Sequence, residues 1–340
     1  MVKIIATSSI YLLTMLFAFI LKKAGLFHKK DKKTLSNLIF YVTLPASLIS
    51  GFTGAQVNVY YVVAIIIGFG VNTVMVIAGQ LASARKGRKM QAIYAVNASG
   101  FNMACIAIPF LSNFYPDGVP YLCMFDVGDS FYTLGTTYAL AQMRIGQANK
   151  ENMNAGRSNK ERINLCRTGY CSVENKRNDK RKKLNKSDMH VSVIFKSLFT
   201  SVPFDVYFIM TILSFLNYKL PDIVIQAADF CGHGNGFLAM MMIGISLELN
   251  MSRETIGEVI HLLLLRYGIG IVSAIFIFYV LTAPLVMRQI LCAAVFSSSA
   301  AVSIIYSEKL GVSTDIAAAL NPLSTVLMIP VMALVVAVTM

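Results

Sequence analysis

The feature that most constrains this chain is a succession of apolar stretches, each long enough to cross a lipid bilayer. A membrane-spanning helix needs ~20 predominantly apolar residues, and the sequence contains about ten such stretches. The predicted spans are residues 4–21, 34–53, 58–82, 90–112, 120–143, 202–218, 225–248, 256–282, 285–307 and 314–338. Charged residues make up only 14% of the chain and avoid these stretches, so its 56% hydrophobic content is assigned to the membrane. The sequence therefore predicts an all-α membrane protein with ten transmembrane helices.

Lysine and arginine gather on alternate loops, which predicts the orientation. One side carries residues 22–33, 85–89 and 144–196, where most of the basic residues lie, followed by Arg253, Arg266 and Lys309. The other side carries Lys3, Lys219 and Arg288. Loops rich in Lys and Arg stay in the cytoplasm. Both termini are therefore predicted outside and the long loop inside, in a multi-pass protein of the plasma membrane.

The long basic loop divides the chain into residues 1–143, 144–196 and 197–340. Its high charge and few aromatic residues predict disorder, and its charge is expected to attract anionic membrane lipid. The same pattern is too unspecific to indicate nucleic acid. Five spans on each side make the second half enter the membrane in the opposite sense. Two inverted five-helix repeats of this kind are typical of secondary transporters.

The sequence lacks the motifs that other function classes require. No nucleotide-cradling loop, nucleophile elbow or H-E-x-x-H pattern occurs, so neither an enzyme nor a primary pump is expected. Cys166 and Cys171 have only His190 nearby, so no metal site is predicted. No cofactor is expected beyond a coupling proton or sodium ion. A receptor or scaffold that keeps a transporter fold is left open, as is a homodimer.

Two acidic residues, Asp126 and Asp129, lie within the predicted fifth span. At ~1.5 Å per residue they are roughly 9 and 13 Å into a span that begins near Pro120, inside a ~30 Å hydrocarbon core. An aspartate at a helix centre costs ~2.5 to 3.5 kcal/mol, whereas each Leu, Ile, Phe or Val returns ~0.3 to 0.6. Both are expected to face an interior cavity, where one binds the coupling proton or cation. We favour Asp129; pairing with Arg266, or contact of Asp126 with external water, is the alternative.

Four tracts resemble the auxin efflux carrier family, which includes plant PIN proteins and bacterial malate-type carriers. SNLIFYVTLPASLISGF (36–52) looks like the family's second-span signature, and NASGFNMACIAIPF (97–110) resembles its fourth span. GFLAMMMIGISLE (236–248) is similar to its seventh span, and YSEKLGVSTDIAAALNPLSTVLMIP (306–330) to its ninth-to-tenth-span connection and tenth span. The likeness covers both halves and excludes only the basic loop.

The resemblance implies the fold of the bile acid/sodium symporter class. Spans 1, 2, 6 and 7 would form a scaffold, and the other spans a transport domain in which the broken fourth and ninth spans cross at the site. Asn102, seven residues before Pro109, matches the family's substrate-contacting asparagine. The chain departs from the family pattern with Val202 before Pro203, and with Ser298 and Ser303 where proline is frequent. The substrate is expected to be a small organic anion.

Further candidate residues surround Asn102. Asn97 either lines the same cavity or bridges helices, which we favour. Ser298, Ser299 and Ser303 are small enough for close helix packing, the commoner role, but together they are also able to bind an anion. The predicted hinges are Pro109, Pro45 and Pro322, each of which interrupts a helical hydrogen-bond ladder.

Overall fold

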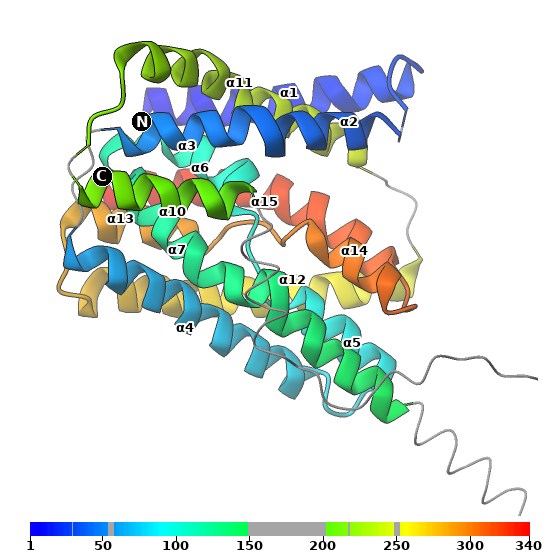
Figure 1. Cartoon of the computed structure of the whole chain (residues 1–340). Coiled ribbons are helices and arrows are strands. Elements are labelled where there is room, and N and C mark those ends of the chain that lie inside the picture. Colours follow the sequence, from blue (N-terminus) through cyan, green and yellow to red (C-terminus); the bar gives the residue numbers. More distant parts are fainter. Residues whose placement is uncertain (29, 54–57, 149–201, 217, 248–251) are drawn as a thin grey trace, which may run out of the picture.

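The computed structural model describes residues 1–28, 30–53, 58–148, 202–216, 218–247 and 252–340. Within these ranges the chain forms helices and no β-strand, and both termini lie at the same end of the helix bundle (Figure 1). Most of the basic loop, 149–196, lies outside the described residues, as do its cysteines and His190. Arg144 belongs to the helical segment that follows η4 (Tyr132–Thr136) in the predicted fifth span, and this segment continues to residue 148.

The first half of the chain contains three long helices, a broken helix and a further helix. The long ones are α1 (Val2–Lys23), the continuous α2–η1–α3 (Asp31–Leu38, Ile39–Thr43, Leu44–Phe52) and α4 (Val59–Ala82). The broken helix consists of α5 (Arg88–Asn97), η2 (Met103–Ala107) and α6 (Ile108–Leu111). A short turn, η3 (Pro116–Gly118), leads into α7 (Val119–Phe131) and η4 (Tyr132–Thr136).

The second half repeats the pattern of long helices around one broken helix. Its elements are α10 (Val202–Phe215), α11 (Asp222–Ser246), α12 (Arg253–Ile275) with η5 (Phe276–Val280), α13 (Leu285–Ala294), α14 (Val302–Lys309) and α15 (Asp315–Thr339). The break between α13 and α14 lies in the predicted ninth span, as the break after α5 lies in the fourth. Broken backbone at membrane depth requires protein around it.

Five of the described helices are long and apolar enough to cross a membrane: Val2–Lys23, Asp31–Phe52, Val59–Ala82, Arg253–Val280 and Asp315–Thr339. The two broken helices fall short in length, and α11 carries polar residues such as Asp229 and Asn235. The described part of the chain is thus all-helical and has apolar helices consistent with a membrane protein, whereas the total of ten spans stays a prediction.

Two predicted hinge prolines follow π-helical turns. Pro45 comes just after η1, and Pro109 just after η2. Because proline lacks an amide hydrogen and crowds the carbonyl four residues back, a wider preceding turn accommodates it. Pro322 differs, since it lies inside α15, which is helical from Asp315 to Thr339.

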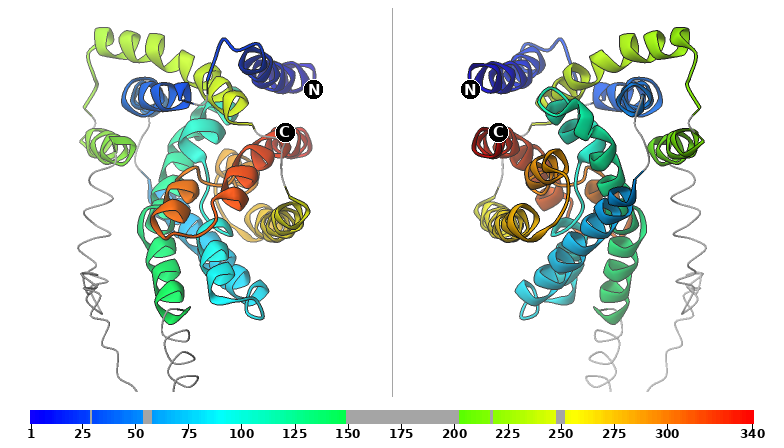
Figure 2. Two further views of the ribbon diagram at one scale, coloured as in Figure 1. Left: turned by 90° about the vertical axis from the view of Figure 1, so that its right-hand side faces the viewer. Right: turned by 90° about the vertical axis from the view of Figure 1, so that its left-hand side faces the viewer.

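The helices form two groups. A peripheral group contains α1, α2–η1–α3, α10 and α11, with α11 packed on α1 and α3. A crossing group contains α4 to α7 and α12 to α15, with α4 packed on α7 and α12 on α15. Figure 2 looks along the helices and shows the peripheral group on one side of the crossing group.

Candidate functional site

The two helix breaks pair with each other at the centre of the crossing group. The amide N–H of Asn102 donates to the carbonyl of Ser298 over 2.9 Å, and that of Ala300 donates to the carbonyl of Gly100 over 3.3 Å. Phe101 and Ser299 form an isolated antiparallel bridge. Two extended segments from distant parts of the sequence therefore satisfy part of each other's backbone.

Gly100 allows the backbone to adopt the conformation found at the first helix break. Its φ is +81°, in the left-handed region that disfavours residues with a side chain. A Cβ at this position would also lie 3.1 Å from the Thr133 hydroxyl and 3.2 Å from the Ala300 methyl. Both backbone conformation and space thus require glycine at the crossing.

Side chains from α4 and α7 cap the first break. The amide oxygen of Asn72 accepts a hydrogen bond from the Gly100 N–H over 2.8 Å. The carboxylate of Asp129 accepts from the Phe101 N–H over 3.2 and 3.3 Å and from the Thr133 hydroxyl over 2.8 Å. Asn72 and Asp129 are fully or almost fully buried. These bonds replace the helical partners that the break removes.

Side chains from α15 cap the second break in a similar way. The Asn321 amide donates to the carbonyl of Ser299 over 2.6 Å, and the Ser299 N–H donates to the Ser324 hydroxyl over 3.0 Å. The Asn321 side chain thus supports the backbone of the crossing.

Arg266 connects both breaks. Its guanidinium donates to the carbonyls of Ala98, Gly100 and Ser297 over 3.2, 2.9 and 3.3 Å, and it lies 5.2 Å from the Phe101 ring centroid. From the sequence alone, Arg266 was grouped with the cytoplasmic loop charges. The structure corrects this, because Arg266 is 4% exposed and lies inside α12. Its hydrogen bonds go to carbonyl oxygens and not to the aspartates.

A cavity of about 120 Å³ adjoins the crossing. Asn102, Asp126 and Asp129 line it from the crossing group, and Phe40 and Tyr207 line it from the peripheral group. Its other lining residues are Phe101, Met103, Ala104, Cys105, Ser130, Thr133, Leu134, Ala300, Ala301 and Val302. The predicted interior position of both aspartates agrees with this arrangement. The cavity lies where the two groups meet.

Several buried polar atoms around the crossing have no partner in the described structure. They are Asn97 Oδ1, Ser99 Oγ, Asn102 Nδ2 and the hydroxyls of Ser297, Ser298, Ser299 and Ser303. Buried polar groups are usually hydrogen-bonded, and each exception requires an explanation. Asn102 is the only one of this set that lines the cavity. Its amide N–H groups are therefore available to a bound molecule.

The other candidate residues lie near the cavity without lining it. The Asn97 amide donates to the carbonyl of Ile93 over 2.8 Å, within its own helix. Ser298 and Ser299 are fully buried at the backbone pairing, and Ser303 is 1% exposed at the start of α14. Their positions fit close helix packing.

Sequence reasoning did not select Asn72 or Tyr207. The Tyr207 hydroxyl donates to the Asp126 carboxylate over 2.6 Å and is buried between the two groups. An isolated asparagine in a strongly apolar span was a usable signal for Asn72. A tyrosine in an apolar span carries no such signal.

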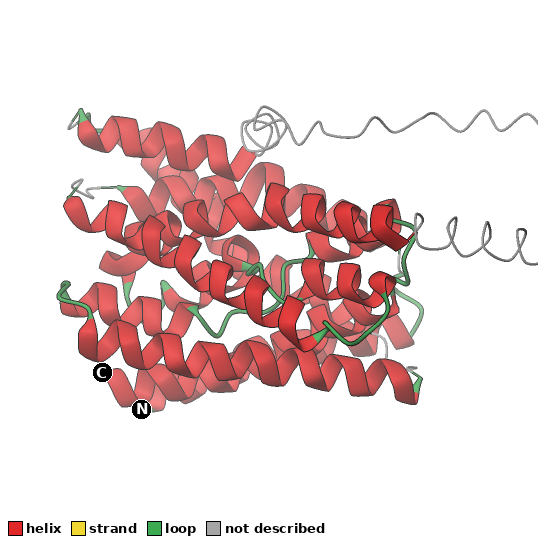
Figure 3. Ribbon diagram, turned by 90° about the horizontal axis from the view of Figure 1, so that it is seen from below, coloured by secondary structure: helices red, strands yellow, loops and turns green. Residues whose placement is uncertain are grey.

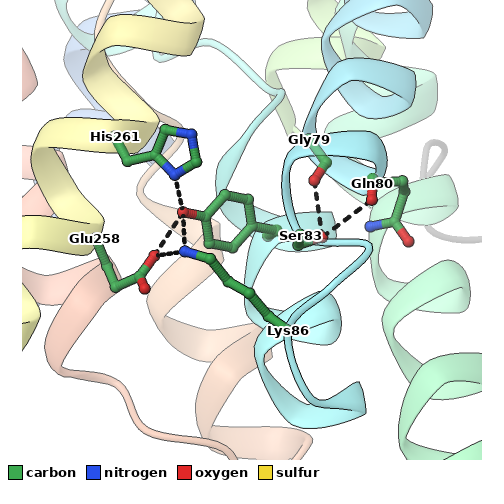
Figure 4. Close-up of polar contacts among 7 residues, drawn as sticks. Gly79, Gln80, Ser83, Lys86, Glu258 and His261 are labelled. Carbon is green, nitrogen blue, oxygen red and sulfur yellow. Dashed lines mark hydrogen bonds and ion pairs between the residues drawn. The ribbon is translucent and has the colours of Figure 1, made fainter.

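A separate polar cluster lies between α12 and the turn that connects α4 to α5 (Figure 4). The Lys86 ammonium lies 2.5 Å from the Glu258 carboxylate, and Tyr94 donates to the same carboxylate over 2.5 Å. His261 Nδ1 lies 2.8 Å from the Tyr94 hydroxyl. The Lys86 and Glu258 side chains are 29% and 23% exposed, so this pair contributes little stability by itself. It joins the start of α12 to the turn before α5.

No group of three or more His, Cys, Asp and Glu side chains that could hold a metal ion occurs in the part of the chain that the structure describes. The four cysteines described there are unpaired: Cys105, Cys123, Cys231 and Cys292.

Comparison with known protein families identifies the chain. The family described as membrane transport protein matches residues 4–336, nearly the whole sequence. No curated protein matches the chain closely enough to be reported as a relative. The matched family is a family of transporters and not of enzymes. The chain therefore belongs to the membrane transport protein family, the auxin efflux carrier family that the four sequence tracts resemble.

Proposed function

We propose that this protein is a secondary transporter that moves a small organic anion across the plasma membrane by alternating access. The observation that carries the proposal is the cavity at the helix crossing, with the unpartnered, buried amide of Asn102 on its wall. An amide N–H without a partner is costly to bury. A substrate oxygen that accepts its hydrogen bond would remove this cost.

The donors around the crossing favour an anionic ligand. Asn102 offers N–H groups to the cavity, and the first residue of α14, Val302, also lines it. The N-terminus of a helix carries partial positive charge, and such termini bind anions. Arg266 adds a full positive charge behind Phe101. A carboxylate in the cavity would lie beside the Asn102 amide and the start of α14.

The same arrangement supports two inverted five-helix repeats with ten spans. In the first half, α7 supplies the acceptor for the Phe101 N–H through Asp129. In the second half, α15 supplies the acceptor for the Ser299 N–H through Ser324. Phe101 and Ser299 face each other in the antiparallel bridge. Corresponding helices thus perform corresponding tasks, as repeats related by a pseudo-two-fold axis would.

Alternating access requires two bodies that move relative to each other, and the two helix groups are suited to this. In the proposed mechanism the crossing group carries the substrate past the peripheral group, which remains as the scaffold. A proton or sodium ion bound at Asp129 or Asp126 would couple this movement to an ion gradient. In the proposed orientation both termini face outside and the basic segment 144–196 faces the cytoplasm.

The proposal predicts that Asn102→Ala abolishes flux, because the substrate loses its hydrogen-bond donor in the cavity. Saturable uptake of labelled small carboxylates into proteoliposomes measures this. The matched control is Asn37→Ala, which removes the same side chain from an exposed position on α2 and should leave flux unchanged.

Melting temperatures in detergent distinguish the possible results. Loss of flux with an unchanged melting temperature supports the substrate role, whereas unchanged flux rejects it. Saturable binding without flux in the wild-type protein would indicate a receptor that keeps the transporter fold.

A further inference from the structure

Two tyrosines of the peripheral group donate hydrogen bonds to oxygen atoms of the crossing group in the described structure. Tyr11 on α1 donates to the carbonyl of Pro109 over 2.9 Å. Tyr207 on α10 donates to the Asp126 carboxylate on α7 over 2.6 Å. Both bonds must break if the groups move past each other. Only the second has an acceptor whose charge can change.

The two cavity aspartates differ in the location of their partners. Asp129 accepts hydrogen bonds from Phe101 and Thr133, so it is held within the crossing group. The hydrogen bond to the Asp126 side chain comes from Tyr207, across the boundary between the groups. A change in the charge of Asp126 therefore acts directly on the contact between the two bodies.

We propose that Asp126 and Tyr207 form a proton-controlled latch between the peripheral and crossing groups, a role that rests on the proposed transport function. While the Asp126 carboxylate is ionised, its charge-assisted hydrogen bond holds the groups in the present arrangement. A proton that arrives through the cavity binds to a carboxylate oxygen, and Tyr207 keeps its own proton. The remaining neutral hydrogen bond is roughly half as strong, so the crossing group is released.

The surroundings of Asp126 allow this switch. The titratable groups that act on it are Tyr207 on α10, Cys105 on η2, and Cys123 and Asp129 on α7. Thiols and phenols in proteins are ordinarily neutral below pH 7. The described structure contains no ion pair between a basic side chain and Asp126. Asp126 also lines the cavity, which provides the route for the proton.

A cross-linking experiment tests the latch independently of flux. The Thr211 hydroxyl on α10 and the Met124 sulfur on α7 are 4.0 Å apart across the same boundary. In a background without native cysteines, Met124→Cys with Thr211→Cys should cross-link readily in the present arrangement. The cross-linked fraction of the full-length protein in lipid vesicles is measured by mass spectrometry at pH 7.5 and 5.5.

The matched control is Tyr11→Phe, which removes another hydrogen bond between the groups, one whose acceptor is a backbone carbonyl that does not titrate. At each pH, cross-linking is compared with this control, because acid also slows thiol chemistry. Relative to it, Tyr207→Phe should cross-link roughly fivefold to tenfold less at pH 7.5 and equally at pH 5.5. Asp126→Asn should behave like Tyr207→Phe, since its amide cannot ionise.

Each result has a defined meaning. If Tyr207→Phe and Asp126→Asn keep the cross-linking and pH dependence of Tyr11→Phe, the latch is overturned. If Tyr207→Phe lowers the melting temperature strongly, the more conservative Asp126→Asn decides alone. A wild-type protein without flux rejects the transport function, yet its cross-linking still reports on the latch. In an active protein, the pH dependence of flux should be lost in Tyr207→Phe and Asp126→Asn and kept in Tyr11→Phe.

Discussion

Arg266 and Asn102 are both buried at the crossing, but only the side-chain donors of Arg266 have hydrogen-bond partners. Arg266 uses its planar fork of donors to satisfy three carbonyls from the two helix breaks. Asn102 does the reverse, because its backbone is paired with Ser298 while its side-chain amide has no partner. Arg266 therefore stabilises the crossing, whereas the Asn102 amide is left without a partner on the cavity wall.

Replacing Arg266 by lysine should destabilise the protein, although the charge is kept. A single ammonium on a flexible stem cannot reproduce the fork geometry. Each carbonyl left without a donor costs about 1 to 3 kcal/mol. Arg288→Lys is the control, since Arg288 donates to one carbonyl, that of Phe278. Thermal unfolding in detergent should show a clear decrease for Arg266→Lys and little change for Arg288→Lys. Equal melting temperatures would contradict the role of Arg266.

At the scale of elements, glycines set how closely the helices approach. A Cβ at Gly68 would lie 2.2 Å from the Phe125 carbonyl oxygen, and one at Gly128 would lie 2.2 Å from that of Ile65. Helices α4 and α7 are therefore in backbone contact, as small residues permit in membranes. This contact holds α7, and with it both aspartates, against the crossing.

Gly128→Ala should force α4 and α7 apart, because the clashing atoms belong to backbone and cannot rotate away. Overpacking of this kind typically costs ~1 to 3 kcal/mol, and here we expect at least the upper value. Gly70→Ala is the control, since a Cβ on that residue of α4 meets nothing within 4 Å. Melting temperature and flux should decrease for Gly128→Ala and be maintained for Gly70→Ala. A stable, active Gly128→Ala would show that the helices can separate without cost.

At the scale of the whole molecule, both chain termini lie at one end of the helix bundle (Figure 3). Helix α1 begins at Val2 and ends with Lys22 and Lys23, so these two lysines lie toward the opposite end. The Tyr115 and Thr339 hydroxyls are 3.2 Å apart, which places the turn around η3 at the end that carries the C-terminus. In the proposed orientation, the end that carries the termini is the external one and the opposite end is the cytoplasmic one.

Single cysteines test the orientation. An impermeant thiol reagent applied to intact cells should not label a cysteine at Lys30, Lys89 or Lys180, because these positions would face the cytoplasm. A cysteine at Asp117, in η3 at the opposite end, should react. Permeabilised cells, in which all four should react, provide the control. Labelling at Lys30 or Lys89 from outside would reverse the proposed topology.

The sequence alone determined the class of this protein, its apolar helices and the family to which it belongs. These three depend on local properties of the sequence. An apolar stretch of about 20 residues indicates a helix surrounded by lipid, and the order of the family's motifs can be read directly along the chain. The family resemblance implied the breaks in the fourth and ninth spans. The interior location of Asp126 and Asp129 was expected from the residues themselves, because charged side chains in lipid require cover.

Only the tertiary structure decided which groups form hydrogen bonds with the backbone at the two helix breaks and where the cavity lies. Arg266 was assigned to a loop because its charge was weighed without knowledge of the three carbonyls that receive it. Asn72, Tyr207 and Ser324 acquire their roles from partners at least 25 residues away in sequence. A hydrogen bond forms between groups that are close in space, and no periodicity along the chain records which distant helices will meet.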